Sequence, residues 1–335
     1  MKRIARLNLC LSICLMMTGV SVGRGGPLHE SPLPGESSSD PDTGFAIYFV
    51  QEQTPVQELL KAPLDEIELE SEPWLAACDI EFYDYSSHCI YLKKPVLEYL
   101  ELENVFDMSM NPRFGPFVVI AGGQRCYLGA FHSLLSSTMY RLPTISEGNL
   151  SHGPPEMLSI SFAWGDTDPR SHSEIERVLR DLDLYRGGLA FTLDSLRVLE
   201  NTDEGATVEY RCTVTSRDLD GLYVLDAPLM GDRFYQFVPG LMLHRRPEPS
   251  LRLVPLEKPQ LELQLDVARQ YVLLPAGESL EWNLTLRTNP IPPAEYRCQA
   301  GFANGGPDDQ PRQRPDGRIW FGRIRSNELE ITVAE

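Results

Sequence analysis

The sequence predicts a mainly β protein, in which a small α+β domain is followed by an antiparallel β-sandwich. Strand-like runs dominate the chain from residue 44 onward, one segment has clear helical periodicity, and from residue 188 the pattern is of strands alone. The chain has 335 residues, of which 42% are apolar, so two globular domains are expected.

The first 23 residues have the composition of a secretory signal peptide. Three cations precede an apolar stretch from Leu7 to Val22, and Ser21 and Gly23 are small residues at the two positions that a signal peptidase reads. We expect cleavage of residues 1–23 and export to the periplasm or the extracellular space, with no membrane span afterwards. The alternative is an uncleaved anchor.

The chain is acidic. It carries 30 basic and 48 acidic residues, a net charge of −18, and loss of the signal peptide would lower this to −21. Nucleic acids are bound through Lys and Arg, so we expect no nucleic-acid partner. Residues 24–43, rich in Pro, Ser, Gly and acids, predict a flexible linker.

Residues 44–187 are predicted to form the α+β domain. Apolar and alternating runs there predict two single strands and two hairpins, the second of which turns at Gly122-Gly123. The strands are Phe45–Val50 and Met157–Trp164, and the hairpins lie within Asp79–Leu92 and Phe117–Phe131.

One helix is predicted in this domain. Ser173 and Glu176 have capping-box spacing, and four apolar residues recur on one helical face. These four are Ile175, Val178, Leu179 and Leu182.

Residues 188–335 are predicted to form the sandwich. Apolar residues alternate with polar ones in six runs separated by turn-forming residues, which is typical of antiparallel sheets around a shared core. The runs contain Leu196 and Val198, Val208–Val214, Leu261–Val267, Leu280–Leu286, Tyr296–Phe302 and Leu329–Val333.

The tetrapeptide EYRC occurs twice in this region, at Glu209–Cys212 and Glu295–Cys298. Tyr and Cys lie two residues apart, so both cysteines should face the core. Cys212 and Cys298 are therefore a candidate structural disulfide of the oxidising compartment, worth roughly 4–5 kcal/mol. The alternative is two separate buried thiols, and free buried thiols are also expected at Cys78, Cys89 and Cys126.

Two features resemble known sandwiches. Tyr296, two residues before Cys298 and after Pro292-Pro293, is similar to the tyrosine corner of immunoglobulin domains, although the tryptophan typical of those domains is missing. The run Leu273–Trp282 with Pro293–Tyr296 resembles bacterial immunoglobulin-like domains such as the BsuPI family of proteinase inhibitors, with Ala294 in place of the usual turn glycine. The resemblance implies an immunoglobulin-like antiparallel β-sandwich.

Motifs of catalysis and metal binding are missing from the sequence. It contains no GxSxG, SxxK, HExxH or CxxC spacing, so no catalytic, cofactor-binding or metal-binding residue is predicted, and no cofactor. His88 and His132 stand near predicted strand ends, where we expect loop exposure. Asp218 and Asp220 are interpreted as turn residues whose side chains cap the backbone.

These observations favour an exported, non-enzymatic binding or structural protein of a bacterial envelope. Its expected partner is a protein or another cell-envelope component. One alternative is a proteinase inhibitor, implied by the sandwich resemblance. The other is a hydrolase whose site is dispersed over residues 44–187, since acid pairs far apart in sequence leave no motif.

Overall fold

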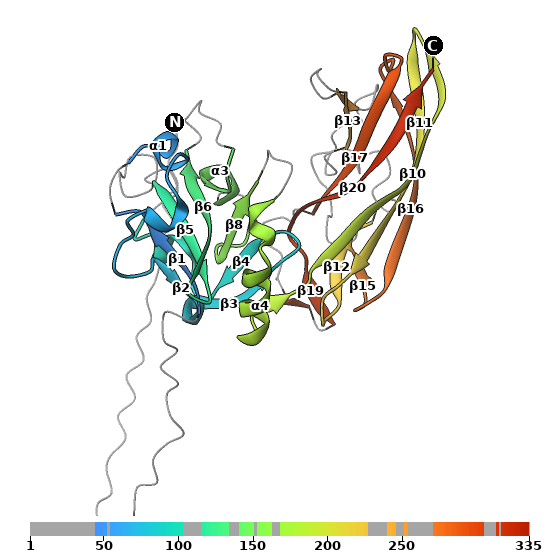
Figure 1. The fold of residues 1–335 in the computed structure, drawn as a ribbon. Coiled ribbons are helices and arrows are strands. Elements are labelled where there is room, and N and C mark those ends of the chain that lie inside the picture. The colour runs from blue at the N-terminus through green and yellow to red at the C-terminus, as the bar shows by residue number, and fades with distance from the viewer. Residues whose placement is uncertain are drawn as a thin grey trace, which may run out of the picture. The chain divides into compact units, whose positions relative to one another are not determined.

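The structure is a computed structural model. It describes residues 44–51, 54–102, 115–133, 141–150, 153–162, 168–226, 240–245, 251–253, 271–304, 313–314 and 316–334, which all fall within one compact unit, Ser39–Glu335. The predicted signal peptide, the linker, the strand Leu261–Val267 and Trp164 lie outside the described residues. The fold is mainly β and contains several sheets, as predicted (Figure 1).

The first half of the described chain forms a nine-stranded mixed sheet in the order β2-β1-β5-β6-β7-β8-β4-β3-β9. The apolar strand at residue 45 lies between two neighbours, as its composition requires. The strands are β1 (Phe45–Phe49), β2 (Leu75–Ala76), β3 (Ile80–Asp84), β4 (Cys89–Leu92), β5 (Pro116–Ala121), β6 (Gln124–His132), β7 (Thr144–Ser146), β8 (Met157–Ser161) and β9 (Tyr185–Arg186).

Both predicted hairpins of this sheet are confirmed. In the β5–β6 hairpin, Ala121 pairs with Gln124, and Gly122 and Gly123 have φ angles of 56° and 75°. Residues other than glycine rarely adopt two positive φ angles in succession, which explains the Gly-Gly pair.

The predicted helix is α4 (Ser173–Asp181), whose buried face carries Ile175, Val178 and Leu179. The fourth residue of the predicted face, Leu182, follows the helix as its C-cap and is exposed. It begins one residue earlier than the capping-box spacing suggests, because His172 is the N-cap and its Nδ1 accepts a hydrogen bond from the Glu174 amide at 3.2 Å. The short helices are α1 (Val56–Leu59), α2 (Val96–Tyr99), α3 (Glu147–Leu150), η1 (Leu64–Glu66), η2 (Ala77–Asp79) and η4 (Pro169–Ser171).

The remaining strands form three smaller sheets, in the orders β10-β11-β16, β15-β12-β19-β18 and β14-β13-β17-β20. The alternation predicted from the sequence places Cys212 on β11 and Cys298 on β17. The strands are β10 (Leu189–Thr202), β11 (Gly205–Ser216), β12 (Leu222–Leu225), β13 (Gly240–His244), β14 (Leu251–Leu253), β15 (Tyr271–Leu274), β16 (Ser279–Thr288), β17 (Ala294–Asn304), β18 (Gln313–Arg314), β19 (Gly317–Ile319) and β20 (Gly322–Val333).

Two large hydrophobic clusters fill the interior. One lies in the nine-stranded sheet and under α4. The other joins the three smaller sheets, and it also includes Cys89, Tyr91 and Met157 from β4 and β8 of the nine-stranded sheet. The two halves of the described chain therefore share buried apolar surface. None of the described helices has the length and apolar character needed to cross a bilayer.

Candidate functional site

The densest group of buried polar side chains lies at the tip of the β3–β4 hairpin, residues 84–89. Asp84, the last residue of β3, is fully buried, and its Oδ1 accepts hydrogen bonds from Ser86 Oγ at 2.7 Å and from the Ser87 amide and hydroxyl at 3.1 Å each. An aspartate forms this turn because its carboxylate can bind the amides and hydroxyls that follow it. The sequence DYSSHC thus encodes a turn organised around one carboxylate.

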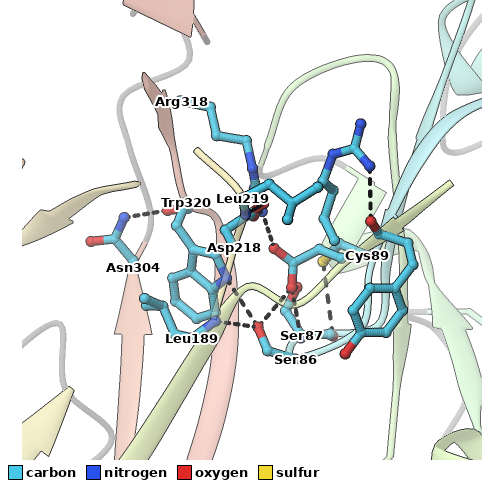
Figure 2. Close-up of polar contacts among 12 residues, drawn as sticks. Ser86, Ser87, Cys89, Leu189, Asp218, Leu219, Asn304, Arg318 and Trp320 are labelled. Carbon is cyan, nitrogen blue, oxygen red and sulfur yellow. Dashed lines mark hydrogen bonds and ion pairs between the residues drawn. The ribbon is translucent and has the colours of Figure 1, made fainter. Parts of the chain in front are cut away.

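The other oxygen of Asp84 binds a cation from the far end of the chain. Nη2 of Arg318, on β19, lies 2.6 Å from Asp84 Oδ2 and 2.5 Å from Asp218 Oδ2. Asp218 also caps its own loop, since its Oδ1 accepts a hydrogen bond from the Leu219 amide at 2.8 Å, as the sequence predicted. Figure 2 shows Asp218 and Arg318 beside the hairpin tip. We call Asp84, Asp218 and Arg318 the Arg318 cluster.

Burial and charge oppose each other in the Arg318 cluster. Burial by itself would lower the pKa of Arg318, but the nearby carboxylates, Asp84 foremost, raise it above the ordinary value. The guanidinium carbon also lies 4.9 Å from the centre of the Phe82 ring. A buried cation held in this way stays charged, and removing it would leave two uncompensated carboxylates, a change that typically costs about 3–5 kcal/mol.

Ser86 makes a second link to the same strand region. Its Oγ accepts hydrogen bonds from Trp320 Nε1 at 3.2 Å and from the Leu189 amide at 3.0 Å (Figure 2). Gly188 permits this approach, because a Cβ atom there would lie 2.1 Å from Ser86 Oγ, and its φ is 63°. Trp320 is held from its other side, where Asn304 Nδ2 donates to its carbonyl and Asn304 Oδ1 accepts from the Leu225 amide.

Apolar contacts surround these polar links. Cys89, Tyr91 and Met157 are at most 6% exposed and share one hydrophobic cluster with Trp320. Full burial of a large apolar side chain contributes about 1.5–3 kcal/mol, so these three account for several kcal/mol. That is a large fraction of the roughly 5–15 kcal/mol by which a protein is stable.

His88 differs from its sequence prediction. Loop exposure was expected, but the side chain is 4% exposed, so the prediction is wrong. Its Nδ1 lies 3.1 Å from the Tyr83 hydroxyl and its Nε2 lies 3.5 Å from Ser171 Oγ. The reason is tertiary, since η4 covers the hairpin tip. Burial, and then the charge of Arg170, lower the pKa of His88 to about 3.

The Ser171–His88 pair has the residue types of a nucleophile and a base, but not their chemistry. A general base works best with a pKa near the working pH, and His88 is far below it. Its Nδ1 faces a tyrosine hydroxyl, where a catalytic histidine would face a carboxylate. The nearby Asp168 is instead paired with Arg170, Oδ1 to Nε at 2.9 Å and Oδ2 to Nη2 at 2.5 Å.

Cys212 and Cys298 are both buried, at 1% and 0% exposure, and belong to one hydrophobic cluster, as the alternation predicted. They stand on different sheets, where Cys212 pairs with Trp282 and Cys298 with Leu329. Both are free thiols in this structure, which corresponds to the alternative of two separate thiols, and the disulfide stays a prediction. Burial raises the pKa of each thiol to about 12.

The other cysteines are free as well. Cys89 is buried, as expected, whereas Cys126 is half-buried and Cys78 is exposed, which corrects the prediction for those two. The described part of the chain brings together no group of three or more His, Cys, Asp or Glu side chains suited to a metal ion.

Sequence reasoning missed the Arg318 cluster. Asp218 was recognised as a turn residue, but nothing in the sequence connects it with Asp84 or Arg318. The chain matches no protein-family model, and the curated proteins include no significant match to it.

Proposed function

We propose that the chain is an exported, non-enzymatic binding or structural protein of a bacterial envelope. One observation carries the proposal. The buried charges of the described chain that lie closest together, Asp84, Asp218 and Arg318, are bound to one another and to the hairpin tip. Groups engaged in this way hold parts of the fold together, which is what a rigid binding or spacer protein requires.

We further propose that residues 44–187 form an α+β domain and residues 188–335 an immunoglobulin-like sandwich. Strand order supports the second assignment. If β10 and β11 are strands A and B, then β16 takes the place of E, and β14-β13-β17-β20 follow the order C′-C-F-G. The Tyr296 hydroxyl donates to the Pro292 carbonyl at 2.7 Å, as in a tyrosine corner.

The composition of the N-terminal 23 residues supports export. The whole chain, expressed in a bacterium, should be recovered from the periplasm or the medium with a mature N-terminus at Arg24. Intact-mass measurement after fractionation tests this. Recovery of the full-length chain in the cytoplasm would contradict export, and a full-length chain in the membrane fraction would identify an uncleaved anchor.

A binding or structural role is tested separately, by chemical cross-linking in intact cells of the producing bacterium. We expect the mature protein to be joined reproducibly to a protein or another component of the envelope. Slowing of a serine or cysteine protease by a stoichiometric amount of the purified protein would favour the inhibitor alternative. Turnover of ester or glycoside substrates that is lost on substitution of a carboxylate within residues 44–187 would favour the hydrolase.

A further inference from the structure

We propose that residues 317–322 are a C-terminal latch, without which the nine-stranded sheet does not complete its folding. The inference deepens the function proposed above and rests on its export step. An exported chain that crosses a membrane before it folds must not form a stable structure early. The latch, at the far end of the sequence from the sheet it closes, provides such a delay.

The latch contacts residues of the hairpin tip that are far from it in the sequence. Asp84 with Arg318, and Ser86 with Trp320, are each 234 residues apart, whereas the other hydrogen bonds of the Asp84 carboxylate come from Ser86 and Ser87. Contacts between distant residues require closure of a long loop before they stabilise anything. The hairpin turn can therefore form locally, but its burial must wait for the latch.

The latch also belongs to the apolar cover of β4 and β8. Cys89, Tyr91 and Met157 belong to the hydrophobic cluster that contains Trp320, and not to the one that lies under α4. Until the latch and its neighbouring strands arrive, one face of β4 and β8 lacks this cover. Arg318 lies over the ring of Phe82 on β3, which extends the same uncovered face.

The latch packs closely against the hairpin tip. Gly322, at the end of the latch, has a φ of 137°, and a Cβ atom there would lie 2.3 Å from Ser87 Cβ. Backbone hydrogen bonds from Arg318 and Trp320 to Gly221 and Tyr223, each 3.1 Å, hold the latch beside β12. The latch therefore meets the hairpin tip in one defined position and is already supported by the smaller sheets.

Because a chain is synthesised from its N-terminus, all nine strands of the sheet are made before the latch. A sheet that could bury both faces by itself would fold at that stage. The arrangement described here predicts instead that the sheet and the latch become protected together.

Pulse-labelling hydrogen exchange during refolding of the full mature chain, residues 24–335, tests this. We expect peptides covering residues 83–92 and 317–324 to gain protection in the same kinetic phase. In Arg318→Met both peptides should lose protection together, by about a hundredfold or more. Arg297→Met removes an exposed arginine of β17 and should change the protection of each peptide by less than about threefold.

Protection of residues 83–92 in an earlier phase than residues 317–324 would overturn the proposal. If Arg318→Met does not fold, Trp320→Phe removes the indole donor to Ser86 and part of a fully buried ring, and it should weaken protection of both peptides in parallel. Loss of protection in only one of the two peptides would contradict the latch. Signal-peptide cleavage is measured independently of folding. If the chain is not cleaved or exported but both peptides gain protection in one phase, export is refuted and the folding order is supported.

Discussion

Arg318 and Asp84 form a buried ion pair of 2.6 Å between residues 234 positions apart. The pair shares its cation with Asp218, so one guanidinium holds a hairpin turn of the nine-stranded sheet and a loop between β11 and β12.

Arg318→Met should lower the free energy of unfolding by about 3–5 kcal/mol, because two buried carboxylates lose their counter-charge. Urea unfolding of residues 24–335 measures the change. Arg297→Met is the matched control, since Arg297 is exposed and lies 3.9 Å from Glu328 and Glu330; it should cost less than about 1 kcal/mol. Equal effects of the two substitutions would contradict a buried role for the Arg318 cluster.

His88 predicts how stability depends on pH. Its pKa is about 3 in the folded protein and about 6.5 in an unfolded chain, so only the unfolded state takes up this proton between those values. The contribution of His88 is therefore complete above pH 6.5 and is lost as the pH falls toward 3, by about 1.4 kcal/mol per unit.

The substitution His88→Asn tests whether His88 causes this loss of stability at acid pH. Asparagine tolerates the positive φ of 53° at this position and does not titrate. Urea unfolding between pH 4 and 7 should show a shallower slope in the variant than in the natural chain. An unchanged slope would assign the acid sensitivity to other groups.

Substitution of two glycines distinguishes the cost of a positive φ angle from the cost of a steric clash. Gly277→Ala should cost about 1–2 kcal/mol, because its φ is 76° but nothing lies within 4 Å of the new Cβ. Gly188→Ala should have a similar conformational cost, because the φ of Gly188 is 63°. Its new Cβ would also lie 2.1 Å from Ser86 Oγ, and this clash should add about 1–3 kcal/mol to the loss of stability. Thermal unfolding of the two variants measures both losses of stability. Equal losses would show that Ser86 does not lie against Gly188.

Tyr296→Phe should destabilise the protein by about 1 kcal/mol, because it removes the hydrogen bond from the tyrosine hydroxyl to the Pro292 carbonyl and retains the ring. Tyr185→Phe, which keeps its ring 3.6 Å from the Arg180 guanidinium carbon, is the control. A loss at Tyr296 no larger than that at Tyr185 would remove the support that the tyrosine corner lends to an immunoglobulin-like sandwich.

Thiol labelling distinguishes free cysteines from a disulfide. In the native protein Cys78 should react with a maleimide, while Cys212 and Cys298 should not, since both are buried and their raised pKa values leave almost no thiolate at neutral pH. After denaturation without reductant, all five cysteines of the mature chain should react. A linked Cys212–Cys298 peptide would restore the disulfide that the sequence suggested.

Much of the local structure could be predicted because its causes are local. The Gly122-Gly123 pair marks a turn that needs two positive φ angles, and the spacing of Ile175, Val178 and Leu179 marks the buried face of α4. The inward direction of Cys212 and Cys298 follows from strand alternation alone. The limit appears at His172, which caps α4 where the sequence favoured Ser173, because several residue types can accept a hydrogen bond from the first turn.

The candidate site lay beyond sequence reasoning. Thirty basic and 48 acidic residues allow far too many pairs for composition to single out Arg318 with Asp84 and Asp218. His88 was expected in a loop because it stands near a predicted strand end, but in the fold it is buried, with Tyr83 and Ser171 beside its ring nitrogens.

The amino-acid sequence by itself determined the mainly β class, the position of its turns and which side chains face inward, since periodicity and turn chemistry act over a few residues. Only the tertiary structure decided which buried charges meet, that the cysteines of β11 and β17 lie on different sheets around one core, and that apolar side chains of β4 and β8 are covered by the end of the chain. Those outcomes depend on closing loops of tens to hundreds of residues, and no short stretch of sequence records where such a loop will close.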